Sequence, residues 1–432
     1  MSGHRVLIFN RSYWPDAEAS GQLLTELCED LACDFDLTVV AGQPNQNPSG
    51  VPCKSWGRDQ HHGVNIRRVP HLTLGKTSLW GRAVNMLTYL AGAAVTALCV
   101  SRPAAVVVET DPFLLPIIGR WLQWRHRCRL IVYLQDIYPD VAVALNKVRQ
   151  GWFTNLLRRW LFSIYRQADR VIVLGDDMRS ILTESGVSPE RITVLPNWAD
   201  TTRIYPIRDA NSFRQREHLE GHFVVMYSGN MGLCQSLDEV LEAAARIRDR
   251  RDILFVLIGD GASRPRLEQF VRERGLENVR FLPYQPHSEL AHSLSAADLH
   301  LVPLDARVTG CVVPSKLYGI LAAGVPALVI ADERCEASRV VERSHTGRIV
   351  PPGNPDLLVD TIAWCADHRQ ELLEMGSRAR QLAEREYDRK TASKRFAHLL
   401  YDTIHGSDAV RESQENPSGI PTAETEKAAS RL

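Results

Sequence analysis

The stretch MYSGNMGLCQSLDEVLEAA, residues 226–244, contains the structural unit that decides the fold. An apolar run is followed by a glycine-bearing loop and then by a segment with the apolar spacing of a helix. The same order of Val- and Ile-rich run, loop and helical pattern recurs along most of the chain. Continuous apolar runs separated by helices are typical of parallel sheets that are covered on both faces. The sequence therefore predicts an α/β protein.

The repeats form two series, which predicts two sheet domains of similar size. Strands are predicted at 5–9, 37–42, 64–70, 104–110, 129–136, 170–175 and 191–197 in the first series, and at 222–230, 253–261, 278–284, 298–304 and 326–330 in the second. A stretch near 196–210 that is rich in Pro, Asp and Thr is the predicted joint. We place the first domain at 1–203, the second at 204–386 and a last helix at 387–405. The polar tail, 406–432, is predicted to be disordered.

Composition excludes several classes of protein. The formal net charge is zero, which argues against a general nucleic-acid binder. The nine cysteines form no C-x-x-C pair, so a zinc module or a disulfide scaffold is not expected. No segment is long and apolar enough to span a bilayer, and the N-terminus is a poor signal peptide. These features predict a cytoplasmic protein.

Loops after the strands of the second domain are the first candidates for a site, because ligands of open parallel sheets bind beyond the carboxyl ends of the strands. Gly229 and Gly232 follow one strand, and a Gly-Asp-Gly turn at 259–261 follows the next. Each is equally compatible with an ordinary turn. Neither matches a Walker A motif or the full dinucleotide fingerprint, which disfavours a dehydrogenase.

A third candidate is VVPSKLYGILAAG, residues 312–324, in which a helix starts near Ser315 and stops at Gly324. Lys316 falls in the first turn, where the helix dipole disfavours a cation. A bound phosphate would explain the lysine. The alternative is that Lys316 points into water.

The order of these motifs resembles glycosyltransferase family 4 over about residues 4–400. Within that family the sequence is most similar to the exopolysaccharide and colanic-acid-type branch. The similarity is carried by RSYWPDAEASGQLLTELCEDLA (11–32), LQDIYPD (134–140), YSGNMG (227–232), FLPYQP (281–286) and VPSKLYGILAAGVP (313–326). The resemblance implies a GT-B fold, in which two Rossmann-like domains face a central cleft.

The resemblance also implies an activity. Members transfer a sugar from a nucleotide diphosphate sugar with retained anomeric configuration, no cofactor and no essential metal. The acceptor, a glycan or a lipid-linked hydroxyl, would bind the N-terminal domain, and the donor would bind the C-terminal one. The helix at 387–405 would pack back on the N-terminal domain. Donor-binding positions carried over from the motifs are Gly229, Asn230, Gly259, Asp260, Leu282, Tyr284, Ser315, Lys316, Leu317 and Glu336.

Four positions depart from the family pattern. Asn230 and Gln235 stand where many members carry an arginine and a lysine that contact the diphosphate. Cys311 and Gly319 stand where many carry paired glutamates, the second of which binds the donor ribose. Lys316 is then the best remaining cation for the diphosphate, and Glu336 is a substitute for the ribose contact.

Candidates in the N-terminal domain follow its strands. Asp136 is the predicted catalytic partner of Lys316, because the family places a residue there beside the sugar or the acceptor; a helix cap is the alternative reading. Asp140, Glu109 and Asp111 are weaker candidates at the same edge. The positions predicted near the acceptor or the phosphates are Arg11, Tyr13, Gly21 and Gln135, and Arg11 is a second candidate cation.

Residues 51–170 hold 17 Lys and Arg against 6 Asp and Glu, and two of their segments mix Trp with Arg. Segments 80–100, 121–129 and 151–167 could contact an anionic membrane surface, or they could be ordinary helices with solvated arginines. The Asp-Phe-Asp at 34–36 lies at the wrong end of a strand for a metal. The stretch DQHH, 59–62, is predicted to be a solvated loop.

Two other functions remain open at this point. A nucleotide-sugar epimerase would use the same two-domain plan without an acceptor. The departures from the family pattern also leave room for a degenerate subunit that binds sugar nucleotides or lipid head groups without turnover. The sugar, the base of the donor, the acceptor, the linkage and the oligomeric state are not predicted.

Overall fold

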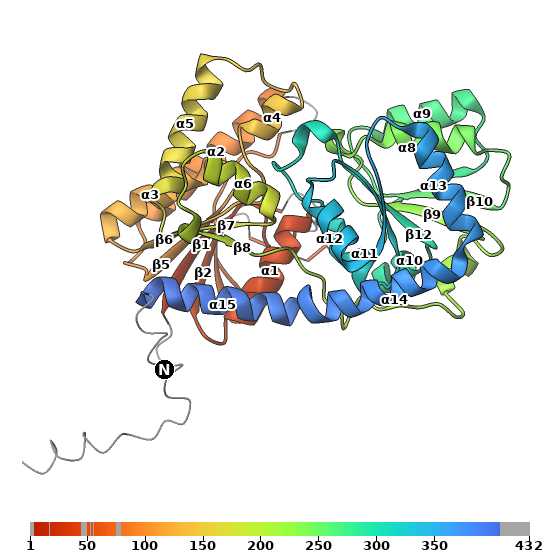
Figure 1. Cartoon of the computed structure of the whole chain (residues 1–432). Coiled ribbons are helices and arrows are strands. Elements are labelled where there is room, and N and C mark those ends of the chain that lie inside the picture. Colours follow the sequence, from red (N-terminus) through yellow and green to blue (C-terminus); the bar gives the residue numbers. More distant parts are fainter. Residues whose placement is uncertain are drawn as a thin grey trace, which may run out of the picture.

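The computed structural model describes residues 4–406 apart from residues 17, 45–49, 52, 55 and 75–78. Two α/β domains lie side by side, and the last helices run along both of them (Figure 1). The predicted tail lies outside the described residues except for Gly406. None of the described helices is long and apolar enough to cross a membrane.

The N-terminal domain is built on an eight-stranded sheet of order β3-β4-β2-β1-β5-β6-β7-β8, which is parallel except for β3. Its strands are β1 (Arg5–Phe9), β2 (Asp36–Ala41), β3 (Gly57–His61), β4 (Val64–Arg68), β5 (Ala105–Glu109), β6 (Arg129–Tyr133), β7 (Arg170–Val173) and β8 (Ile192–Val194). Its helices are α1 (Ala19–Leu31), α2 (Leu79–Leu98), α3 (Leu115–His126), α4 (Asp140–Ala144), α5 (Trp152–Gln167), α6 (Asp176–Glu184) and the 3₁₀ turn η1 (Pro189–Arg191).

The C-terminal domain has a six-stranded parallel sheet of order β11-β10-β9-β12-β13-β14. Its strands are β9 (Phe223–Ser228), β10 (Ile253–Ile258), β11 (Val279–Leu282), β12 (Leu299–Pro303), β13 (Ala327–Ile330) and β14 (Gly347–Val350). Its helices are α7 (Ser212–Arg216), α8 (Leu237–Arg246), α9 (Arg264–Arg274), α10 (Leu290–Ser295), α11 (Lys316–Ala322), α12 (Glu336–Ser344), α13 (Pro355–Asp367) and α14 (Arg369–Glu386). Short 3₁₀ turns are η2 (Leu233–Gln235), η3 (His287–Glu289) and η4 (Ala306–Val308).

Burial explains why the strands could be recognised. All residues of β5 and β10 are buried, because helices cover both faces of each sheet. Along β9, Val224 and Met226 enter the core on one face while Val225 and Tyr227 enter the core on the other. Two strands were not predicted. β3 lies at the sheet edge with a polar sequence, and β14 is short and only its last residue is buried.

The prediction that DQHH, residues 59–62, forms a loop is wrong for three of its four residues. Asp59 to His61 form the end of β3, which pairs antiparallel with β4, and His62 lies in the turn between the strands. His61 is half-buried, and its Nε2 lies 3.0 Å from Glu29 Oε1. The alternating exposure of an edge strand hides this hairpin from an apolar pattern.

Helix α15 (Arg389–His405) follows α14 and packs on α1 of the N-terminal domain. Phe396, Leu399 and Leu400 enter the N-terminal core. At its start, Arg389 is paired with Glu29 and Asp30 of α1 at 2.9 and 2.8 Å. The chain therefore crosses twice between the domains, near the predicted joint and just before α15.

The domains also meet at the carboxyl ends of their sheets. After β6, Ile137 N donates to Cys311 O at 2.9 Å, and Asp136 forms an antiparallel bridge with Val312. After β7, the start of α6 contacts the start of α12 through Glu336. These contacts bring the loops that follow both sets of strands together.

Candidate functional site

The chain order of each sheet reverses at one point, β1/β5 in the N-terminal domain and β9/β12 in the C-terminal domain. Such switch points are where open α/β sheets bind ligands. The residues that follow these strands therefore form the candidate site.

At the N-terminal switch point, Arg11 follows β1 and Asp111 follows β5. Their side chains form a bidentate pair, with Arg11 Nε 3.1 Å from Oδ1 and Nη2 3.0 Å from Oδ2 of Asp111. Glu18 lies 3.6 Å from the same guanidinium. Two carboxylates thus already offset the charge of Arg11, and its contact with a phosphate stays a prediction.

Three carboxyl groups gather around this edge. Burial, and then the charge of Asp111, raise the pKa of Glu109 to about 8 and that of Asp136 to about 6. Glu109 accepts a 3.3 Å hydrogen bond from the predicted Gln135. Thr110 Oγ1 accepts the backbone N–H groups of Gln135 and Asp136 at 3.1 and 3.4 Å. Asp136 is a partly exposed residue, and with a pKa of about 6 its carboxyl can change its protonation state near that pH.

Two residues predicted beside the acceptor play a packing role. Tyr13 is fully buried in the N-terminal core, so its ring does not reach the surface of the site and this prediction is wrong. Gly21 is buried inside α1, and a Cβ there would come within 2.3 Å of Ser12 Oγ. A glycine is required at position 21 because the loop after β1 packs directly on the helix.

At the C-terminal switch point lies Lys316. Its Nζ is 3.6 Å from the ring centroid of Tyr227, over the end of β9. This ammonium nitrogen is buried and has no hydrogen-bond partner among the described residues. Burial without a counterion lowers the pKa of Lys316 well below its usual value. The alternative that Lys316 points into water is wrong.

The predicted glycine turns lie around this lysine. Gly229 has φ +141°, and a Cβ there would lie 3.3 Å from Lys316 Nζ. A Cβ on Gly259 would come within 2.0 Å of Gly229 O, so these two turns pack backbone against backbone. Gly259 N donates to Leu282 O at 3.1 Å, which adds the end of β11. Three successive strand ends thus form one surface next to Lys316.

Other predicted donor positions lie on or below this surface. Asn230, Asp260 and Tyr284 are exposed, and Tyr284 Oη donates to Asp260 O at 3.4 Å. Ser315 is partly exposed, whereas the Leu317 side chain belongs to the core. The backbone N–H of Leu317 donates to Pro314 O at 3.3 Å.

The N-terminal candidate Asp136 approaches the glycine turn after β9. Burial, followed by the charges of Asp136 and Asp305, raises the pKa of the Cys234 thiol to about 11. Cys234 lies in η2, which begins directly after Gly232. Val312, which pairs with Asp136, lies four positions before Lys316 in the chain. The two residues predicted to be catalytic therefore lie on opposite sides of one domain junction.

Glu336 has a different environment from the one expected. Its Oε2 accepts the backbone N–H of Asp176 at 3.1 Å, and its own N–H donates to Asp177 Oδ2 at 3.0 Å. Each carboxylate thus caps the first turn of the other domain's helix. Sequence reasoning missed Asp177, since nothing local relates two residues 159 positions apart.

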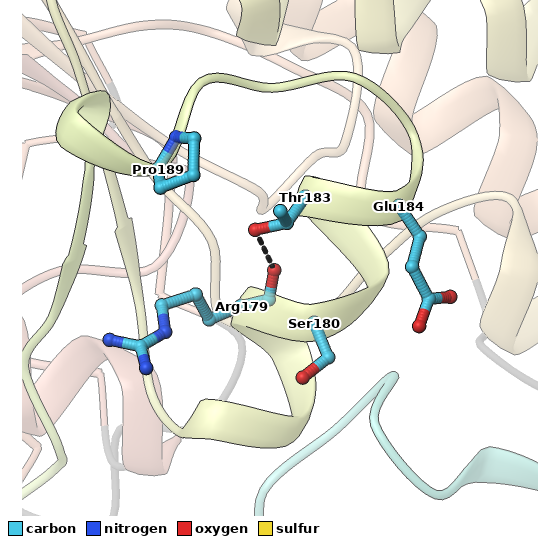
Figure 2. Close-up of a pocket in the computed structure, with 5 residues that line it drawn as sticks. All are labelled: Arg179, Ser180, Thr183, Glu184 and Pro189. Atoms are coloured by element: carbon cyan, nitrogen blue, oxygen red, sulfur yellow. Dashed lines mark hydrogen bonds between the residues drawn. The ribbon is translucent and has the colours of Figure 1, made fainter.

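A depression elsewhere contains none of the predicted residues. It lies on α6 and η1, where Thr183 Oγ1 donates to the carbonyl of Arg179 at 2.9 Å (Figure 2). Its other lining residues, Ser180, Glu184 and Pro189, carry no motif of the sequence. We do not assign it a role.

Two protein-family models each match a different part of the chain. The family model described as glycosyl transferase 4-like domain matches residues 18–198. The model described as glycosyl transferases group 1 matches residues 209–382. The boundary between the two matches falls in the predicted joint.

Two curated relatives point the same way. WcaI of Escherichia coli K12, described as a colanic acid biosynthesis glycosyl transferase, is 27% identical over 407 residues, which cover 91% of this chain and 98% of WcaI. The glycosyltransferase WbjE of Pseudomonas aeruginosa is 27% identical over 68% of this chain and 74% of its own.

Among solved structures, sucrose-phosphate synthase of Thermosynechococcus elongatus superimposes with a TM-score of 0.74 at 18% identity, covering 94% of this chain and all of that one. HepE of Anabaena, crystallised with UDP and glucose, gives a TM-score of 0.71 at 17% identity, covering 92% of this chain and all of HepE. At such identities the likeness shows the fold alone, and it confirms the GT-B prediction. Since the two family models together match most of its length, the chain belongs to glycosyltransferase family 4, in the exopolysaccharide and colanic-acid-type branch.

Proposed function

We propose that this protein transfers a sugar from a nucleotide diphosphate sugar to a hydroxyl of a glycan or lipid-linked acceptor, with retention, in polysaccharide biosynthesis. The observation that carries the proposal is the buried ammonium of Lys316, which has no partner at the switch point of the C-terminal sheet. A buried charge without a partner costs several kcal/mol, on the order of the whole net stability of many domains. A fold that keeps such a group is best explained by an anion that binds there.

A diphosphate suits this place better than a single carboxylate. The lysine lies beside Gly229, where the missing side chain lets a ligand approach the backbone. A solved HepE structure contains UDP-glucose, so this fold holds such a donor in another protein.

The proposed chemistry divides between the two sides of the junction. The bond between the sugar's anomeric carbon and the diphosphate breaks, and a bond to the acceptor oxygen forms. Lys316 stabilises the negative charge that develops on the leaving diphosphate. Asp136, as a carboxylate, orients the acceptor hydroxyl or receives its proton. The proposal assigns charge neutralisation to Lys316 and not to a metal, so transfer should survive treatment with EDTA.

A thermal-shift panel with UDP, GDP, ADP, dTDP and NAD tests the donor site. A ligand at 100 times its Kd stabilises a protein by about 2.7 kcal/mol. We expect one nucleoside diphosphate to stabilise the wild type and the Lys394→Met control, in which an exposed lysine is removed, but not Lys316→Met. A shift with NAD alone, or an equal shift in all three proteins, would contradict the proposal. Sugar transfer that requires an acceptor then separates a transferase from an epimerase or a binding subunit.

We also propose that the acceptor domain contacts an anionic membrane surface. Helices α2, α3 and α5 pack in series and expose Trp80, Trp124, Trp152 and Trp160, which are 83%, 71%, 79% and 53% accessible. Between α3 and α5 an apolar groove is lined by Ile117, Arg120, Trp121, Trp124, Trp160 and Ile164. Tryptophans beside arginines suit the interface of an anionic bilayer.

Vesicle sedimentation tests this contact. We expect the protein to pellet with vesicles rich in phosphatidylglycerol and to stay in solution with phosphatidylcholine vesicles. The variant Trp124→Ala/Trp152→Ala/Trp160→Ala should lose the binding and keep its affinity for the nucleotide. If the variant sedimented with the vesicles as much as the wild type does, the proposed contact of these tryptophans with the membrane would be wrong.

A further inference from the structure

We propose that Glu29, His61 and His62 form a binding site for a divalent transition-metal ion of the zinc class. Their ligand atoms all lie within 4.8 Å of one another, and they are the one such group among the described residues. Ligand atoms on a tetrahedral zinc ion lie about 3.3–3.6 Å apart, because each bond is about 2.0–2.2 Å long. The ligand atoms thus need to approach one another by at most about 1.5 Å to share an ion.

Different elements bring the three groups together. Glu29 lies on α1, His61 is the last residue of β3, and His62 occupies the hairpin turn. The rings of the two histidines are 4.3 Å apart and nearly perpendicular, and His61 Nε2 is 3.0 Å from Glu29 Oε1. Trp14 stacks on His61 at 4.2 Å with an angle of 15°, which holds that ring in place.

The donor set fits one class of ion. Two imidazole nitrogens and one carboxylate oxygen are ligands that suit Zn²⁺, Co²⁺ and Ni²⁺, whereas Mg²⁺ and Ca²⁺ prefer oxygen alone. Three protein ligands leave a fourth position for water. If Glu29 bound the ion, the nearby guanidinium of Arg389 would still have a counterion, because it also pairs with Asp30 through two hydrogen bonds of 2.9 and 2.8 Å.

The position of the cluster assigns the ion a structural role. The hairpin turn precedes β4, so it lies at the amino ends of the parallel strands, opposite the edge that carries Arg11 and Asp136. An ion there would tie the edge hairpin to α1, next to the start of α15. This site is independent of the transfer chemistry proposed above.

The hairpin offers a variant that removes a ligand and favours folding. His62 has φ +46° and Gly63 φ +83°, the signs of a type I′ turn, in which asparagine is the preferred first residue. His62→Asn should therefore fold at least as well as the wild type. His218→Asn is the matched control, because His218 is also exposed and has φ +51° but lies outside the cluster.

Equilibrium dialysis of the reduced full-length chain against Zn²⁺ measures uptake, and Co²⁺ spectra report the ligands. We expect one ion per chain for wild type and His218→Asn, and about tenfold or weaker binding for His62→Asn and Glu29→Gln. Zinc should raise the melting temperature of the first two proteins only. Equal binding by all variants, no uptake at micromolar zinc, or a thiolate band in the cobalt spectrum would overturn the site.

Discussion

Each sheet carries a cationic side chain at its switch point, but only the cation of the N-terminal sheet is paired with carboxylates among the described residues. At β1/β5 the guanidinium of Arg11 is paired with Asp111 and Glu18. At β9/β12 the ammonium of Lys316 is buried against the ring of Tyr227 with no anion among the described residues. The N-terminal site has balanced its cation within the fold, and the C-terminal site has not.

The difference assigns each domain its part in the proposed reaction. A cation that the fold already neutralises has little to offer a diphosphate, whereas an unpaired buried one gains most from an incoming anion. The N-terminal edge instead holds carboxyl groups with raised pKa, which suits contact with an acceptor hydroxyl.

Lys316→Met should lower kcat/KM for transfer by about 1000-fold, the range found when a group that stabilises transition-state charge is removed. The same change should raise the free energy of unfolding by about 1 kcal/mol or more, because a buried unpaired charge is replaced by an apolar chain of similar length. Chemical denaturation measures the second effect. A variant that is both inactive and less stable would mean that the lysine supports the fold.

Asp136→Asn should lower kcat by about 100-fold if the carboxylate handles the acceptor proton. In the wild type, kcat/KM should be flat above pH 6 and fall about tenfold per unit below it, because the pKa of Asp136 is raised to about 6 and the protonated form is inactive. The pH profile of the variant should lack this acid limb. An identical limb in both proteins would assign the titration to another group, such as Asp111.

Arg11→Met should act on stability in the opposite direction from Lys316→Met. Two carboxylates lose their cation, which should cost about 2 kcal/mol for this partly exposed pair. Adding Asp111→Asn should recover part of the loss, and a double-mutant cycle gives the coupling. Nucleotide affinity should not change. If Arg11→Met lost nucleotide binding while keeping its stability, the contrast between the two switch points would fail.

The fold was predictable because burial on both faces leaves continuous apolar strands, as in β5 and β10. The C-terminal half of the site was predictable for a related reason: glycine turns and Lys316 follow strands, and strand ends of a parallel sheet share one edge. What could not be predicted depends on partners distant in sequence. Tyr13 follows the same strand as Arg11, yet its ring is buried in the core. Arg11 meets Asp111 only because β1 pairs with β5.

The smallest expected effect concerns Glu336, for which the sequence predicted a ribose contact. In the structure its carboxylate caps α6 while Asp177 caps α12. Asp177→Ala should cost about 1 kcal/mol, as loss of a cap does. Glu336→Gln should cost less than about 0.5 kcal/mol, since an amide oxygen still accepts the N–H of Asp176 and burial already disfavours the charge. Calorimetric titration with the nucleotide should give affinities within about twofold of wild type for both variants. A drop of tenfold in Glu336→Gln alone would show that this residue also serves the donor, because the Asp177 variant opens the facing cap, on α12, without touching that carboxylate.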